Sequence, residues 1–182
     1  MKIQLSETSV KDAIQRLKTL EDNIRIANEN IVDRLVNTGS EQAMFYNSTA
    51  PTYGVSDIRI IAETTLNGNK SKGTISMNGS NAVYYEFGTG EEGMTSPHPV
   101  KENFGLRPYN SGPFVSTHIN KAGRHYWLIP KGKYSPNSYV RKGGYTEGIP
   151  AGKQMYNTAQ HLHSIKYDII KKELNAAVRK FK

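Results

Sequence analysis

The clearest pattern along the chain is a helical stripe of apolar residues near its start. These residues fall three or four positions apart, the spacing of one face of an α-helix; they are Val10, Ala13, Ile14, Leu17, Leu20, Ile24, Ala27, Ile31 and Leu35. Ser6, Thr8 and Ser9 offer N-cap oxygens, and Ser9 has capping-box spacing to Asp12. Because Asn37-Thr38-Gly39 is typical of a C-cap, the pattern predicts a helix of about 30 residues, roughly 45 Å long.

Short segments with the character of β-strands follow this helix. The expected strands are 55–65, 73–77 and 82–87, and a shorter one is expected at 2–5, ahead of the helix. Asn67-Gly68 and the run 78–81 supply turn residues between them. Three strands joined by short turns predict an antiparallel meander.

The last part of the chain predicts a long loop arm and a second helix. Residues 91–147 carry no long periodic segment, and their prolines exclude a helix over much of it. Within this arm, 125–129 and 138–141 have the composition of a hairpin. An apolar stripe then predicts a helix over 153–180. We therefore expect a single α+β domain over 1–182, with two long helices packed on an antiparallel sheet and the arm inserted at 91–147.

The composition narrows the class of protein. The chain has 182 residues, 36% of them hydrophobic, and a mean hydropathy of −0.62, so we expect a modest core and much surface, loop or subunit interface. The lack of cysteine excludes disulfide bonds, cysteine-ligated metal centres and a thiol nucleophile. The sequence shows no signal-peptide segment and no apolar run of membrane-span length, from which we expect a soluble, intracellular product with no membrane partner.

Positive charge is concentrated in one part of the sequence. Residues 101–150 hold eight basic and two acidic residues, a net charge of +6, together with eight aromatic residues. Such a segment can bind nucleic acid, because cations meet phosphates and rings stack on bases. It can also be a loop arm that packs against a neighbouring subunit, and we favour this interpretation. The candidate residues for docking, or for lining a DNA-filled lumen, are Lys131, Lys133, Arg141 and Lys142.

A glycine pattern at 88–93 resembles a dinucleotide-binding motif without its context. The spacing is G-x-G-x-x-G, after an expected strand. Pyrophosphate binding needs a helix to begin at this point, and Pro97 and Pro99 prevent that. Glu91 and Glu92 would also repel phosphates. We therefore expect no nucleotide cofactor.

The histidines favour solvated or interface positions over a metal site. They are His98, His118, His125, His161 and His163. His161 and His163 lie two apart on the expected second helix, about 200° around it, and so cannot share a metal ion. The alternative that stays open is a metal-dependent nuclease using His118, His125 and Glu102.

The most distinctive acidic residue is Glu86, at the end of the third expected strand. Alternation would place Tyr85 and Phe87 on one face and Glu86 on the other. A carboxylate at such a point can cap backbone N–H groups or pair with an arginine. Because no nucleophile lies near it in the sequence, we assign it no catalytic role, and we expect the protein not to be an enzyme.

The order of these elements and one motif resemble a known family. The motif comprises Ala82, Tyr84, Tyr85, Glu86, Phe87, Gly88 and Thr89. With Ala50-Pro51 upstream and Pro150, Met155 and Ala159 downstream, it resembles the minor tail-component, or head–tail joining, family of tailed bacteriophages. The resemblance spans most of 1–90 and 148–182. The chain departs from the family pattern at Thr52-Tyr53-Gly54 and at Ala151-Gly152, which stands in place of Pro-Phe.

The resemblance implies a structural role in the virion. Members of the family lie at the neck, between portal or connector and stopper proteins on one side and tail terminator and tube proteins on the other. They assemble as homo-oligomeric rings, commonly six- or twelvefold, through which DNA passes, and have no known catalysis or cofactor. The resemblance thus implies a virion protein that is found in the host cytoplasm during assembly.

Overall fold

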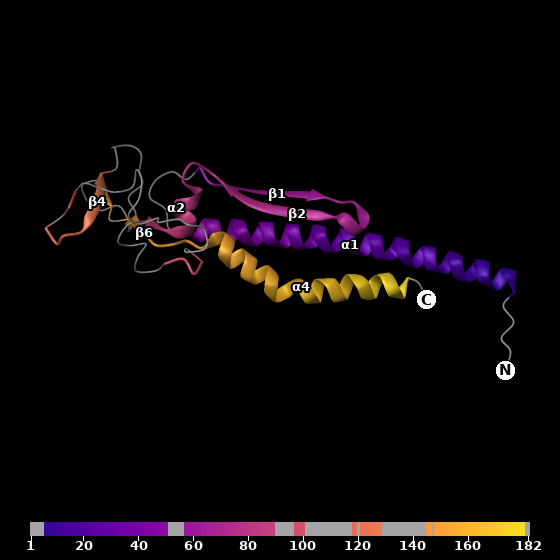
Figure 1. The fold of residues 1–182 in the computed structure, drawn as a ribbon. Coiled ribbons are helices and arrows are strands. Elements are labelled where there is room, and N and C mark those ends of the chain that lie inside the picture. Colours follow the sequence, from indigo (N-terminus) through magenta and orange to yellow (C-terminus); the bar gives the residue numbers. More distant parts are fainter. Residues whose placement is uncertain are drawn as a thin grey trace. The chain divides into compact units, whose positions relative to one another are not determined.

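The structure is a computed structural model that describes residues 6–50, 57–89, 97–100, 118–119, 121–128, 145–146 and 148–180. Its elements are α1 (Glu7–Thr49), β1 (Arg59–Thr65), the 3-10 helix η1 (Gly68–Lys70), β2 (Lys72–Asn78), α2 (Ala82–Phe87), β3 (His118–Ile119), β4 (His125–Leu128), β5 (Tyr145–Thr146), β6 (Gly148–Ile149) and α4 (Gln154–Arg179) (Figure 1). A long N-terminal helix, a C-terminal helix and a two-stranded antiparallel sheet confirm the α+β class.

Contacts divide the chain into two compact units. The first comprises 1–39, 62–75 and 161–182, and the second 40–61 and 76–160. Both long helices and both strands of the β1–β2 sheet contribute residues to each unit. The single domain over 1–182 stays a prediction, and most of the arm at 91–147 lies outside the described residues.

The start of α1 is set by Ser6. Its hydroxyl oxygen accepts the backbone N–H of Ser9 at 3.1 Å, and its carbonyl oxygen accepts the N–H of Val10 at 3.1 Å. Ser6 is therefore the N-cap. The capping box expected from Ser9 and Asp12 is wrong, because Ser9 lies inside the helix and donates its own hydroxyl to the carbonyl of Ser6. The short strand expected at 2–5 lies outside the described residues.

The expected end of the first helix at Gly39 is wrong, because α1 continues to Thr49. Gly39 serves close packing instead. A Cβ built there would collide with the Cδ1 atom of Ile75 on β2 and lie 2.8 Å from Leu162 Cδ1 on α4. The buried stripe also continues beyond it through Ser40 and Ala43. A glycine that lets two neighbours approach a helix looks, in sequence, like one that ends it.

The tip of the β1–β2 hairpin is held against α1 by polar side chains. The backbone N–H of Gly68, which has a φ of +47°, donates to Glu29 Oε1 at 2.7 Å. The amide of Asn28 donates to the carbonyl of the same glycine. Because these bonds use main-chain groups at the tip, they fix where the hairpin lies along the helix. The turn expected around Asn67-Gly68 is confirmed, as is the strand at 73–77.

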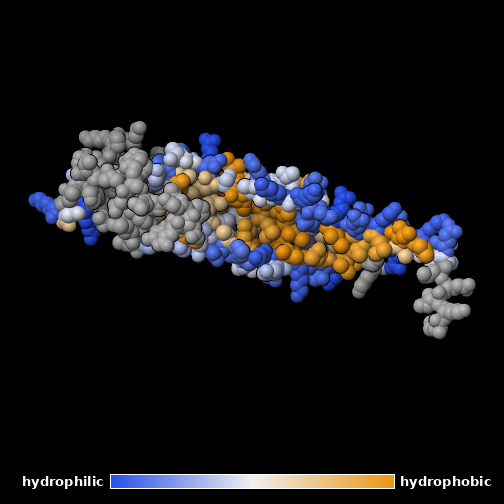
Figure 2. All heavy atoms as spheres, in the orientation of Figure 1, coloured by the Kyte–Doolittle hydropathy of each residue, from blue (hydrophilic) through white to orange (hydrophobic). Residues whose placement is uncertain are grey.

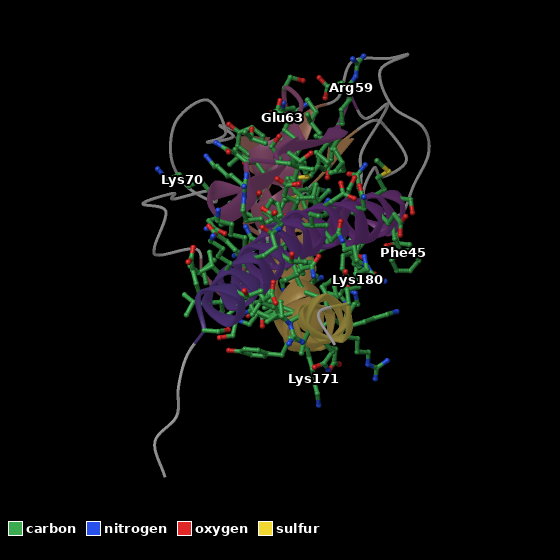
Figure 3. All side chains as sticks on the ribbon, turned by 90° about the vertical axis from the view of Figure 1, so that its right-hand side faces the viewer. Phe45, Arg59, Glu63, Lys70, Lys171 and Lys180 are labelled. Carbon is green, nitrogen blue, oxygen red and sulfur yellow. The ribbon has the colours of Figure 1, made fainter. Side chains whose placement is uncertain are left out.

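In the first unit α1 lies between the hairpin and α4 (Figures 1 and 3). Arg34 on α1 forms an ion pair with Glu173 on α4. Ala27 and Ala177, one on each helix, are 3% and 4% exposed. Figure 3, which looks along α1, shows Glu63 of β1 and Lys171 of α4 on the two outer sides of this arrangement. The second helix, expected over 153–180, is confirmed with bounds Gln154–Arg179.

The third expected strand is wrong, because residues 82–87 form the helix α2. The buried positions include Ala82, Tyr85 and Glu86, which have the i, i+3, i+4 spacing of a helix face. The turn before α2 starts the helix, since Asn81 O accepts the N–H groups of Tyr84 and Tyr85 at 3.0 and 3.1 Å. The described meander therefore has two strands, β1 and β2, in one sheet.

A second small sheet contains β3, β4 and β5 in that order. The strand expected within 125–129 is confirmed as β4. Its described partners are β3 and β5, both antiparallel, while the expected partner at 138–141 lies outside the described residues.

Candidate functional site

The motif that carries the resemblance closes around the N-terminus of α4. Glu86, near the C-terminal end of α2, is 6% exposed. Its Oε2 accepts the backbone N–H of Met155 at 2.9 Å, and its Oε1 accepts that of Tyr156 at 2.9 Å. These are N–H groups in the first turn of α4, which have no partner inside the helix. Glu86 thus caps a helix that begins 68 positions after it, and its negative charge suits the helix dipole.

The N-cap position of α4 holds a lysine, whose side chain has no acceptor for the N–H groups of the first turn. Lys153 precedes the helix and has a φ of +57°, the one positive value among the described non-glycine residues. Its N–H donates to the carbonyl of Glu86 at 3.1 Å, and that of Gly152 donates to the carbonyl of Tyr85 at 2.8 Å. The carbonyls that end α2 are therefore satisfied by the segment leading into α4. Each helix end supplies what the other lacks.

A buried histidine completes the arrangement. His98 is 3% exposed, and its Nε2 lies 3.0 Å from Glu86 Oε1. Its Nδ1 accepts the backbone N–H of Val100 at 3.2 Å. A backbone N–H can only donate, so Nδ1 acts as the acceptor and Nε2 is the ring nitrogen left to donate to Glu86. The ring also packs against Phe87 and Tyr156, with centroids 4.3 and 5.3 Å away.

Gly88 brings α2 against the backbone before α4. It has a φ of +78°, and a Cβ there would lie 2.6 Å from the nitrogen of Ala151 and 2.8 Å from the carbonyl oxygen of Ile149. Both neighbours are backbone atoms, which cannot rotate away. Glycine is therefore required for its conformation and for the close approach.

Thr89 extends the contact by one residue. It forms an isolated antiparallel bridge with Ile149, and its Oγ1 accepts the N–H of Ile149 at 3.3 Å. Thr89 and Ile149 are both buried. Tyr85 is buried as well, while Tyr84 is half-buried. The six motif residues 84–89 therefore act together as a clamp, which we call the Glu86 clamp, with His98 as its seventh member.

The Glu86 clamp is suited to a structural role. Both carboxylate oxygens accept hydrogen bonds from α4, and both nitrogens of His98 are occupied. An acid or base needs a face open to substrate, and here Glu86 and His98 are enclosed. Glu86 does cap backbone N–H groups, as the sequence suggests, but it does so from a helix.

The sequence interpretation missed buried His98. We expected solvated or interface histidines, and this is wrong for His98. The sequence did hold a signal of an ordered position, because Pro97 and Pro99 flank His98 and fix the backbone angle φ at both neighbours.

Gln154, the first residue of α4, was also missed. Its side chain is fully buried, and neither its Oε1 nor its Nε2 has a hydrogen-bond partner.

The remaining candidate residues are not brought together in the described structure. Lys131, Lys133, Arg141, Lys142 and Glu102 lie outside the described residues. In the register of β3 and β4, His118 pairs with Tyr126 and His125 pairs with Ile119, so the two histidines are not partners. Among the described residues no group of three or more histidine and acidic side chains could hold a metal ion.

A small pocket of about 40 Å³ between α1 and α4 is lined by residues including Asn23, Asn30 and Glu173. None of the described helices combines the length and apolar character that crossing a bilayer requires.

No protein-family model, curated protein or solved structure matches the chain.

Proposed function

We propose that this protein is a structural subunit of a tailed-bacteriophage neck, which joins the head connector to the tail by assembling with its own copies into a ring. The virion position is proposed from the resemblance of the 82–89 motif and of the order of elements. The assembly is proposed from the way in which the described residues distribute apolar side chains. No substrate or cofactor enters the proposal.

The observation that carries the proposal is that over half of the buried hydrophobic residues are alanines, while many large apolar side chains of the two long helices are exposed. Five of the nine buried hydrophobic residues recorded for the described chain are alanines. Large apolar side chains are exposed along the two long helices; they are Val10, Ile14, Leu17, Ile24, Ile26, Met44, Phe45, Tyr167, Leu174 and Val178. Figure 2 shows hydrophobic residues gathered into a band on the face in view. A band of this kind is typical of a protein–protein interface.

The Glu86 clamp supports the same function. Residues that carry the resemblance fix the start of α4 through backbone hydrogen bonds. A motif whose carboxylate is buried and bound to backbone N–H groups suits a protein that works by assembly. A ring of copies then uses two different surfaces of each subunit, one meeting the other on the next copy.

Sedimentation velocity of the purified full-length chain over a range of concentrations tests the assembly. We expect a discrete particle of six or twelve copies, with a ring visible by negative-stain electron microscopy. A chain that stays monomeric at all concentrations would overturn the proposal.

Immunogold labelling of phage particles with an antibody to this chain tests the position in the virion, and we expect gold at the head–tail junction. Gold elsewhere, or none, would reject the neck position even for a chain that forms rings.

A further inference from the structure

The first turns of α1 expose a regular coiled-coil seam. Apolar residues alternate at spacings of three and four; they are Val10, Ala13, Leu17, Leu20, Ile24, Ala27 and Ile31. In heptad terms Val10, Leu17 and Ile24 occupy a positions, and Ala13 and Leu20 occupy d positions. Every residue from 7 to 19 is exposed, with Leu17 at 62%. The seam is therefore open over these turns.

The same seam is covered farther along α1 by α4. Ala27 at the next d position is 3% exposed, and Ala177 of α4 is 4% exposed. Arg34, one heptad on, pairs with Glu173 of α4. The chain thus covers its own seam from Ala27 onward and leaves the preceding turns uncovered. An amphipathic helix gains most of its stability from packing of its apolar face, so a partner on these turns would stabilise them.

The polar face of this segment indicates which partner. Residues 7–25 hold four basic and four acidic side chains; they are Lys11, Arg16, Lys18, Arg25, Glu7, Asp12, Glu21 and Asp22. A helix that lies on a lipid surface is typically rich in lysine and arginine. A neutral face of mixed sign instead complements a second copy of itself. In parallel neighbouring helices, Arg16 at a g position would face Glu21 at the following e position of the next copy.

We propose that residues 7–24 of α1 pack in parallel and in register against the same segment of a neighbouring copy. This deepens the proposed function and rests on it, because it names one contact through which copies meet. Copies in a cyclic ring are related by rotation about one axis, so helices that run along the axis remain parallel to their neighbours.

Cysteine cross-linking tests the register of the two helices. Because the chain has no native cysteine, every disulfide formed must involve the introduced thiol. Leu17→Cys places a thiol at an a position, where parallel in-register partners bring the two sulfurs together. We expect mild oxidation of the full-length variant to yield disulfide-linked dimers. The matched control is Gln15→Cys, at a residue that is also exposed and lies at an f position on the far side of the same turn; we expect it to remain uncross-linked. Equal cross-linking of both variants, or none of Leu17→Cys, would overturn the proposal.

A charge exchange tests the pairing by a second route. Arg16→Glu and Glu21→Arg each place like charges opposite each other, and we expect each to weaken self-association about fivefold. The double variant Arg16→Glu/Glu21→Arg restores opposite signs and should restore association. Failure of the double variant to recover would overturn the parallel register.

The outcomes separate this inference from the function on which it rests. Rings that form without the Leu17→Cys cross-link would reject the helix pairing and leave the proposed ring intact. A monomeric chain would reject both. A monomer that binds vesicles of phosphatidylglycerol and phosphatidylcholine through this segment would assign the seam to a lipid surface and overturn the pairing.

Discussion

The Oε2 atom of Glu86 lies 2.9 Å from the backbone nitrogen of Met155, although the two residues are 69 positions apart in the chain. One side chain thereby joins the end of α2 to the beginning of α4. The same carboxylate also accepts the N–H groups of Tyr156 and His98. Because three donors depend on one acceptor group, α4 should lose its defined start when that group is removed.

Glu86→Ala should be strongly destabilising. It leaves the two backbone N–H groups and the imidazole N–H without an acceptor, and each buried donor left unpaired costs about 1–3 kcal/mol. We expect the free energy of unfolding in urea to fall by at least about 3 kcal/mol, and by less for Glu86→Gln, which keeps one acceptor oxygen. The matched control is Glu63→Ala on the exposed side of β1, for which we expect a change within about 0.5 kcal/mol. Equal effects of Glu86→Ala and Glu63→Ala would contradict the role of the cap.

Two glycines share a positive φ but differ in how closely other atoms approach them. Gly88 and Gly123 have φ values of +78° and +77°, but a Cβ on Gly123 would meet nothing within 4 Å. Alanine at Gly123 should therefore cost only the left-handed strain, about 1–2 kcal/mol. Alanine at Gly88 adds a collision with the backbone at Ala151, so we expect a clearly larger loss in urea unfolding. Similar losses at both positions would show that the approach of the two backbone segments is not required.

The sequence predicts an element of secondary structure well when its apolar pattern repeats over several turns. The stripes of α1 and α4 repeat over many turns, so the helices and the start of α4 are predicted well. The six residues of α2 are too few for a period to emerge. Their valine, tyrosine and phenylalanine content favours a strand. Burial of Tyr85, Glu86 and Phe87 together is decided by contacts with residues far along the chain.

Within the site, the sequence singles out Glu86 but leaves its partners unknown. A carboxylate that caps N–H groups can be inferred from its type, whereas the donors at Met155 and Tyr156 come from a distant segment. His98 was visible only as a histidine between prolines. The roles of Gly39 and Gly88 depend on which atoms approach them in space.

Gln154→Met should stabilise the protein, which is unusual for a buried substitution. The side chain of Gln154 is fully buried, and both of its polar atoms lack hydrogen-bond partners. Methionine has a similar shape without the amide, so it removes a desolvation cost of about 1–3 kcal/mol. We expect urea unfolding to show a gain approaching that size. Thr158→Val is the contrasting control, because its hydroxyl donates to the carbonyl of Gln154 at 2.7 Å and its loss should destabilise. A destabilised Gln154→Met variant would mean that the amide is satisfied in solution.

The carboxylate of Asp57 should make a small part of the stability depend on acid pH. Hydrogen bonds from the backbone N–H of Ser80, at 3.0 Å, and from its hydroxyl, at 2.7 Å, hold the pKa of Asp57 below its ordinary value. Since the pKa is lowered on folding, this contribution is fully present above the ordinary aspartate pKa of about 3.9. It is lost as the pH falls through the lower value of the folded state.

Ser80→Ala isolates the hydroxyl from the backbone donor. The N–H of residue 80 remains, and it is the larger cause of the shift. We expect NMR titration of the Asp57 carboxyl to show a pKa that rises toward the ordinary range without reaching it. Asp57→Asn should remove this acid-dependent part of the stability, so the difference in unfolding free energy between the two proteins should shrink as the pH falls. A pKa of Asp57 that is unchanged in Ser80→Ala would show that the hydroxyl does not stabilise the carboxylate.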